Sequence, residues 1–178
     1  MKDLIVLDFD KTLIPFDSFR KYLLIWLKHF PFFISGLIIS RKLRTLSLKE
    51  MKESLIIKIR NHKNFNRINV SFAKYLVAKI NYNLLEEIKK KGGPDTVFLL
   101  ISASPDEYIS LLSEDLGFVA KGSYFDKGFY FHLYKKEKIE FLKNNFPRDE
   151  FHYLYAISDS ETDREMLGMF QDYSLLVT

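Results

Sequence analysis

The chain begins with the pattern of one buried strand and then shows no strand pattern for a long interval. The run Leu4–Leu7 is continuously apolar and ends at Asp8, which is typical of a strand buried in a parallel sheet. Apolar residues at helical spacing then extend from Asp17 to about Asn81. This interval is too long for one crossover helix between neighbouring strands. The sequence therefore predicts a mostly helical subdomain inserted directly after the first strand.

Four helices are expected within this interval. Asp17 or Ser18 is the expected N-cap of the first, and Ser47 with Glu50 forms a capping-box pattern that opens the third. The second and fourth are expected over residues 32–43 and 66–81. The segment 22–40 is long enough to cross a bilayer, but Lys28, His29 and Pro31 interrupt it near its middle. We therefore expect two short helices there, with no stable membrane insertion.

After residue 82 the patterns of helix and strand alternate. Such alternation predicts an α/β fold with right-handed crossovers between parallel strands. The expected core comprises residues 1–14 and 82–178, and the expected helical cap comprises residues 15–81. The expected elements are helix 84–91, strand 96–102, a helix with Ser104 as N-cap and Pro105 at its first position, a hairpin of 119–124 and 129–134 around residues 126–128, helix 136–144, strand 151–158, a short helix 163–169 and strand 173–177.

Composition excludes several classes of protein. The sequence has 178 residues, of which 47% are hydrophobic and 28% are charged, so an intrinsically disordered chain is excluded. It contains no cysteine, which excludes disulfides, thiolate nucleophiles and cysteine-ligated zinc. The net charge of +4 suits an anionic small molecule, and we expect no nucleic-acid partner. The N-terminal apolar run is too short for a signal peptide, so we expect a cytoplasmic protein.

Acidic and polar side chains follow the expected strands or lie near the start of a helix. Each alone has an ordinary interpretation, as a turn residue, a helix cap or a solvated lysine. Together they are expected at the carboxyl edge of the sheet, where ligands bind in open α/β folds. Clustered carboxylates are costly without a cation, and a hard divalent ion such as Mg²⁺ removes that cost. The residues are Asp8, Asp10, Ser102, Lys138, Asp159 and Asp163.

The spacing of two of these acids suggests a reaction. Asp8 and Asp10 are two residues apart after a strand, so both can reach one small site. One carboxylate can attack a phosphorus centre and form an aspartyl phosphate. The other can protonate the leaving oxygen and then deprotonate the attacking water. Ser102 and Lys138 would hold the phosphoryl oxygens, where negative charge develops.

Four segments together resemble the motifs of the haloacid dehalogenase-like superfamily, in its phosphatase form. The helical interval between the first two segments resembles the cap of the phosphoserine-phosphatase-like branch. The resemblance implies a Rossmann-like three-layer parallel-sheet core with an inserted small α-helical cap. The four segments follow the family's order and are Asp8-Phe9-Asp10-Lys11-Thr12-Leu13, Ile101-Ser102-Ala103-Ser104-Pro105, Glu137-Lys138-Ile139-Glu140-Phe141-Leu142 and Ser158-Asp159-Ser160-Glu161-Thr162-Asp163.

This resemblance implies a role for each matching residue. Asp8 is the expected nucleophile, and Asp10 is the expected general acid and base, whose backbone carbonyl also binds metal. Asp8, Asp10 and Asp159 are the expected ligands of Mg²⁺. The expected phosphate-binding residues are Ser102, Ala103 and Lys138. Two residues have supporting roles: Thr12 braces the loop, and Asp163 orients water or Lys138.

Substrate choice is expected to lie in the cap. Asp17 lies nine residues after Asp8, and a glutamate at that spacing contacts the substrate amine in phosphoserine phosphatases, so Asp17 is either a substrate contact or a helix cap. Ser158 stands where the family usually has glycine, and Ala103-Ser104 replaces a frequent Gly-Gly pair, which weakens an assignment to phosphoserine. The expected partner is a small phosphorylated metabolite.

Three alternatives stay open at this point. A response-regulator receiver also gathers aspartate, a hydroxyl residue and lysine at strand ends, although in a different chain order and without an inserted cap. A phosphotransferase would share every catalytic residue, and a phosphate-binding module would bind without turnover. The apolar residues of the cap also leave peripheral contact with a membrane open. The sequence does not specify the oligomeric state.

Overall fold

The computed structural model describes residues 1–176, and its centre is one six-stranded sheet in the order β4-β3-β2-β1-β5-β6. All neighbouring strands pair in parallel except β4, which is antiparallel to β3. The first strand therefore lies in the interior of the sheet, between β2 and β5. The strands are β1 (Lys2–Leu7), β2 (Val97–Pro105), β3 (Val119–Asp126), β4 (Phe129–Phe131), β5 (Phe151–Ser158) and β6 (Asp172–Leu175).

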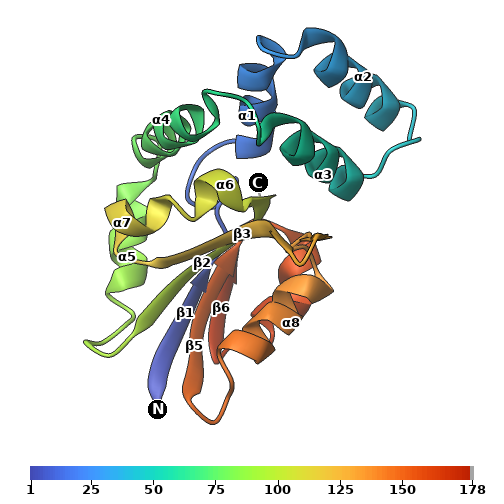
Figure 1. Cartoon of the computed structure of the whole chain (residues 1–178). Coiled ribbons are helices and arrows are strands. Elements are labelled where there is room, and N and C mark those ends of the chain that lie inside the picture. Colours follow the sequence, from blue (N-terminus) through green and yellow to red (C-terminus); the bar gives the residue numbers. More distant parts are fainter. Residues whose placement is uncertain (177–178) are drawn as a thin grey trace.

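Helices cover both faces of the sheet, as a doubly wound fold requires. Leu4 and Val6 of β1 pack into one apolar cluster with helices α8 and α9, whereas Ile5 and Leu7 join a second cluster with α5 and α7. Figure 1 shows α5 and α7 on one side of the strands and α8 on the other. The expected α/β core of three layers is confirmed. These helices are α5 (Tyr82–Lys89), α6 (Asp106–Ile109), α7 (Leu112–Leu116), α8 (Lys136–Asn145) and α9 (Arg164–Leu167), and a 3₁₀ turn, η1, spans Glu161–Asp163.

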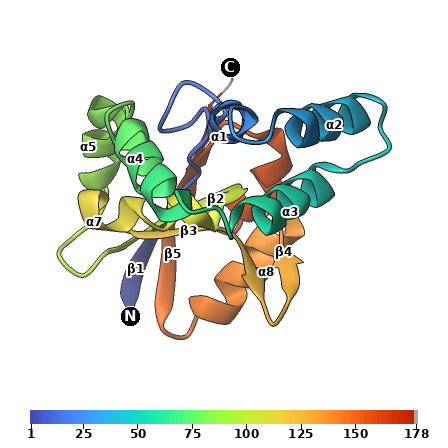
Figure 2. The same ribbon diagram turned by 45° about the horizontal axis from the view of Figure 1, so that its top comes forward.

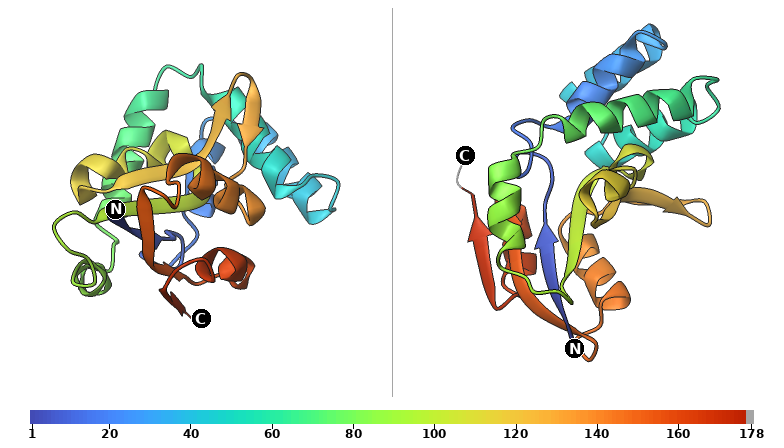
Figure 3. Two further views of the ribbon diagram at one scale, coloured as in Figure 1. Left: turned by 90° about the horizontal axis from the view of Figure 1, so that it is seen from below. Right: turned by 90° about the vertical axis from the view of Figure 1, so that its left-hand side faces the viewer.

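The helical insertion lies over the carboxyl ends of the parallel strands (Figure 3, right). The backbone N–H of Asn81 donates to the carbonyl of Leu13 at 2.8 Å, so the two ends of the insertion meet beside β1. The division into a core of 1–14 and 82–178 and a cap of 15–81 stays a prediction. The helices of the insertion are α1 (Ser18–Leu27), α2 (Pro31–Lys42), α3 (Leu48–Ile59) and α4 (Phe65–Val77).

Local signals explain where these helices begin and end. Asp17 caps α1 by accepting the N–H of Arg20, and Ser47 and Glu50 form the expected capping box at α3. The expected break falls between Leu27 and Pro31. No helix of the described residues has the length and apolarity that a membrane crossing needs.

Two expectations at element ends were wrong, and a third can be checked only in part. Ser104 does not cap a helix, because β2 continues to Pro105, α6 begins at Asp106, and the Ser104 hydroxyl hydrogen-bonds Asp10 instead. The hairpin turn is shorter than expected: β3 runs to Asp126, and Lys127 and Gly128 alone form the turn, both with positive φ. The last strand ends at Leu175, and Val177, where its end was expected, lies outside the described residues.

Candidate active site

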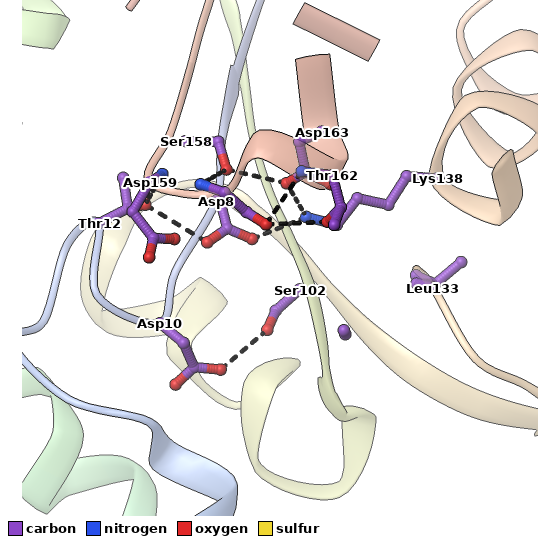
Figure 4. A network of polar contacts seen from close by, with 12 residues as sticks. Asp8, Asp10, Thr12, Ser102, Leu133, Lys138, Ser158, Asp159, Thr162 and Asp163 are labelled. Carbon is purple, nitrogen blue, oxygen red and sulfur yellow. Dashed lines mark hydrogen bonds and ion pairs between the residues drawn. The ribbon is translucent and has the colours of Figure 1, made fainter. Parts of the chain in front are cut away.

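Asp8, the first residue after β1, lies at the centre of a buried charge cluster. The ammonium of Lys138 in α8 lies 2.7 Å from a carboxylate oxygen of Asp8 and 2.7 Å from one of Asp163. Lys138 and Asp163 are each only 2% exposed. Figure 4 shows Lys138 reaching between the two carboxylates. One ammonium thus bridges two acids that come from opposite ends of the chain.

Burial and charge shift the pKa values in this cluster. Burial raises the pKa of Asp8 to about 7, although the Lys138 ammonium opposes that rise. Desolvation disfavours the charge on Lys138, but the carboxylates of Asp8 and Asp163 outweigh it and raise the pKa of the lysine. Lys138 therefore stays protonated at neutral pH. Asp8 is a carboxylate whose ionisation depends on neighbouring positive charge.

Thr12 connects the first acidic segment to the last. Its hydroxyl lies 3.3 Å from a carboxylate oxygen of Asp8, to which it donates, and it accepts the backbone N–H of Asp159 at 2.9 Å. Ser158, which stands where the family usually has glycine, donates its hydroxyl to Asp163 at 2.9 Å. These bonds hold the loops after β1 and β5 together. Thr12 thus contacts both loops, and Asp163 contacts Lys138 as well as Ser158.

Asp10 belongs to the same loop as Asp8 but turns its carboxylate elsewhere (Figure 4). It accepts the Ser104 hydroxyl at 2.6 Å and the backbone N–H of Ser18, at the start of α1, at 2.6 Å. The Ser102 hydroxyl makes a longer contact of 3.4 Å with it. Burial raises the pKa of Asp10, and the hydrogen bonds from Ser104 and Ser18 oppose that rise. Asp10 thus links the end of β2 to the start of α1 as well as facing the site.

A cavity of about 220 Å³ lies between these groups and the helical insertion. Asp17 lines this cavity and also caps α1, so its two expected roles are compatible in geometry. The carbonyl of Ala103 accepts the Ser123 hydroxyl at 2.8 Å and an ammonium from α3 at 2.6 Å. The expected site residues lining the cavity are Asp8, Asp10, Asp17, Ser102, Ala103, Lys138, Asp159 and Asp163.

The ammonium that donates to the Ala103 carbonyl belongs to Lys52, which no sequence pattern above singled out. Lys52 lies on α3, is 3% exposed, and forms no ion pair among the described residues. Its ammonium lies 3.3 Å from Nε2 of His132. Burial lowers the pKa of Lys52 to about 8, an effect that Asp10 and Asp17 oppose. Burial, together with the nearby Lys52 charge, lowers the pKa of His132 to about 3, so this imidazole is neutral and can accept from the lysine.

A signal for Lys52 was present in the sequence. It lies three residues before Leu55 and four before Ile56, on the face of α3 that is buried. A lysine among the apolar positions of an amphipathic helix indicates a polar partner or an anionic ligand beneath that helix. In this fold, what lies beneath is the cavity.

The side chains around Asp8 supply only some of the oxygen ligands that a hard divalent cation needs. No group of three or more histidine and acidic side chains suited to a metal ion occurs within residues 1–176. The carboxylate of Asp10 is directed to Ser104 and Ser18. Asp8 and Asp159 remain as carboxylate donors, and Asp159 forms no ion pair in the described part of the chain. Carboxylate oxygens are the donors that Mg²⁺ prefers, so these two side chains fit such an ion.

Comparison with solved structures finds the same fold elsewhere. A protein of unknown function from Bordetella pertussis Tohama I is 13% identical, with a TM-score of 0.65 over 99% of this chain and 100% of that one. A phosphoserine phosphohydrolase-like protein from Francisella tularensis subsp. tularensis SCHU S4 is 19% identical, with a TM-score of 0.58 over 97% of this chain and 86% of that one. An apo phosphoserine phosphatase is 17% identical, with a TM-score of 0.51 over 97% and 85%. These similarities establish the fold.

A search of curated protein sequences finds no significant match. The family model of haloacid dehalogenase-like hydrolases, in contrast, matches residues 5–168. This span begins within β1 and ends just after α9, so it includes all four segments on which the resemblance depends. The chain belongs to the haloacid dehalogenase-like hydrolases.

Proposed function

We propose that this protein is a Mg²⁺-dependent phosphatase that hydrolyses a small phosphomonoester through an aspartyl phosphate on Asp8. One observation carries the proposal: a buried carboxylate, Asp8, lies between the Lys138 ammonium and the Thr12 hydroxyl at the floor of a cavity that Asp10 also lines. Asp8 is held in place there, with positive charge beside it. A non-catalytic module would not need both acids.

The first chemical step is assigned to Asp8 and Asp10. A carboxylate oxygen of Asp8 forms a bond to phosphorus while the ester oxygen leaves with the bonding electron pair. Asp10 donates a proton to that leaving oxygen, so an alcohol departs. Burial raises the pKa of Asp10, which is the direction that a general acid requires. The product of the step is an acyl phosphate on Asp8.

The second step returns the enzyme to its starting state. Asp10, now ionised, takes a proton from water, and the water oxygen attacks the phosphorus of the aspartyl phosphate. The Asp8–phosphorus bond breaks, and inorganic phosphate leaves. The hydroxyl of Ser104 and the N–H of Ser18 stabilise Asp10 in its ionised form between the two steps.

Cations around the cavity neutralise charge on the transferred group. Asp8, Asp159 and the carbonyl of Asp10 are the proposed Mg²⁺ ligands, and the ion would offset repulsion between Asp8 and the phosphate. Lys138, with Ser102 and the backbone at Ala103, would hold phosphoryl oxygens. Lys52 on α3 brings a further ammonium to the cavity. The helical insertion therefore has to be closed over the core for this charge to reach the substrate.

The test is phosphate release from a panel of phosphorylated metabolites, with Mg²⁺ and with chelator. Asp8→Asn should abolish release on every substrate. Asp95→Asn, an exposed acid in the loop before β2, is the matched control and should leave release unchanged. Release that persists in Asp8→Asn would refute the nucleophile. A phosphoryl group retained on Asp8 after an acid quench, detected by mass spectrometry, would support the intermediate.

The same assay separates hydrolysis from transfer. Glycerol added as an acceptor alcohol should leave the yield of inorganic phosphate unchanged if water alone attacks the intermediate. Formation of glycerol phosphate at the expense of inorganic phosphate would make the protein a phosphotransferase. Phosphate binding without turnover would make it a binding module.

A further inference from the structure

The helical insertion carries a charge that the overall net charge conceals. Between residues 15 and 81 the chain has fourteen lysines and arginines and only three acids, Asp17, Glu50 and Glu53, which gives this part a net charge of +11. The whole chain carries +4, so the remainder carries −7. Opposite charges are thus segregated between the insertion and the sheet. Such a field attracts a large anionic surface and orients the molecule toward it.

The outer face of α2 is apolar and exposed. Phe32 is 93% exposed, Ile39 is 56% exposed and Leu43, just after the helix, is 69% exposed. Their spacing of seven and four residues places them on one stripe of the helix. The opposite face, with Ile34 and Leu37, is buried against α1 and α3. Figures 1 and 2 show α2 at the outer end of the molecule, beyond the sheet.

A groove between α1 and α4 repeats this combination of apolar and basic residues. It has a volume of about 560 Å³ and lies outside the cavity that contains Asp8. Leu24, Ile68 and Tyr75 contribute apolar surface, and Leu24 is 55% exposed. Its charged side chains are all basic: Lys21, Lys28 and Arg67.

We propose that the helical insertion binds the surface of an anionic lipid bilayer, with the α2 stripe (Phe32, Ile39 and Leu43) inserted at the interface. A bilayer with acidic lipids supplies negative headgroups for the basic side chains of the insertion and hydrocarbon for the α2 stripe. A nucleic acid would neutralise the lysines and arginines but would leave Ile39 and Leu43 in water. Because the helices are short, the contact is peripheral.

The test is co-sedimentation of the whole protein with vesicles of phosphatidylcholine, with and without phosphatidylserine. Binding should require phosphatidylserine and weaken as salt is added, because the charges are screened. Phe32→Ser/Ile39→Ser should weaken binding on the order of tenfold, since the variant lacks the apolar area whose transfer out of water favours insertion. Lys21→Glu/Lys28→Glu should weaken it at least about tenfold.

Two matched controls separate this surface from the rest of the protein. Phe129→Ser removes a side chain that is 73% exposed on β4 of the core, and Lys90→Glu/Lys143→Glu makes the same change of charge outside the insertion. Both should bind like wild type, and circular dichroism confirms that each variant is folded. Equal losses in the controls, or no binding to phosphatidylserine vesicles, would overturn the proposal. So would binding to single-stranded RNA that is tighter than binding to vesicles and unaffected by Phe32→Ser/Ile39→Ser.

Discussion

Replacing Lys138 by methionine should expose the energetic cost of holding two acids at the floor of the cavity. The ammonium lies 2.7 Å from carboxylate oxygens of both Asp8 and Asp163 and is almost completely buried. Methionine keeps most of the side-chain length and fills the space without charge. The variant therefore leaves two buried carboxylates with no cation between them.

The magnitude follows from the burial of all three groups. Removing one partner of a buried ion pair typically costs about 3–5 kcal/mol, because the other charge stays buried and unpaired. We expect the free energy of unfolding at pH 8 to fall by about that amount. Since small domains are stable by about 5–15 kcal/mol, this is a large share of the total.

The loss should depend on pH in one direction. Burial already raises the pKa of Asp8 to about 7 with Lys138 in place, and removal of the ammonium raises it further. A carboxyl whose pKa is higher in the folded than in the unfolded state favours folding at low pH, and this contribution is lost as the pH rises through the folded-state pKa. The difference between wild type and Lys138→Met should therefore be small at pH 5 and large at pH 8.

Urea denaturation, followed by the fluorescence of the single tryptophan, Trp26, measures this difference. Trp26 is fully buried in the insertion, so its emission changes on unfolding. Lys143→Met, an exposed lysine on the same helix, is the control and should change stability by less than about 0.5 kcal/mol. An equal loss at pH 5 and pH 8, or no loss at either, would refute the assignment of Lys138 as the cation that balances the two acids.

Three further predictions follow from the site and its surroundings. Asp10→Asn should retain phosphate binding, measured by calorimetry, but slow turnover by about a hundredfold or more, and wild-type turnover would contradict its role as acid and base. Lys52→Met should lower kcat/KM by at least about tenfold, because the buried ammonium lines the cavity and forms no ion pair among residues 1–176. A lower melting temperature with unchanged kcat/KM would mean that Lys52 serves only to join the insertion to the core through its hydrogen bond to Ala103. Burial raises the pKa of Glu107 to about 7 from 4.5, so ionisation of this carboxyl destabilises the fold as the pH rises through this interval. The free energy of unfolding of Glu107→Gln, measured with urea, should equal that of wild type at pH 4.5 and exceed it by about 2 kcal/mol at pH 8. Equal urea midpoints at pH 8 would count against the shift.

Local patterns in the sequence were sufficient for most of the fold. The apolar run Leu4–Leu7 predicted the central strand, and its alternate residues do face two helical layers. The Ser47–Glu50 pair predicted the start of α3, and the Lys28–Pro31 break predicted two helices in place of a span. Capping, proline and strand signals act over a few residues, so the sequence displays them directly.

The positions of Asp8, Asp10 and Asp159 at the carboxyl edge also followed from the order of strands along the chain. In a parallel sheet every crossover returns the chain to the same end, so residues that follow strands gather at one edge. The candidate site could therefore be outlined before the fold was known. Its chemistry stays a prediction until the variants are measured.

Contacts between distant segments were decided by the tertiary structure alone. Ser104 has a good N-cap pattern, yet its hydroxyl bonds Asp10, ninety-four residues away, because the extended β2 carries it into the site. Lys52 resembles an ordinary helical lysine until α3 lies over Ala103 and buries its ammonium. Local signals specify which residues form an element, whereas burial and charge depend on which elements pack together. The sequence therefore determined which elements form and at which edge the acids gather, and only packing of the insertion onto the sheet determined which side chains enclose them.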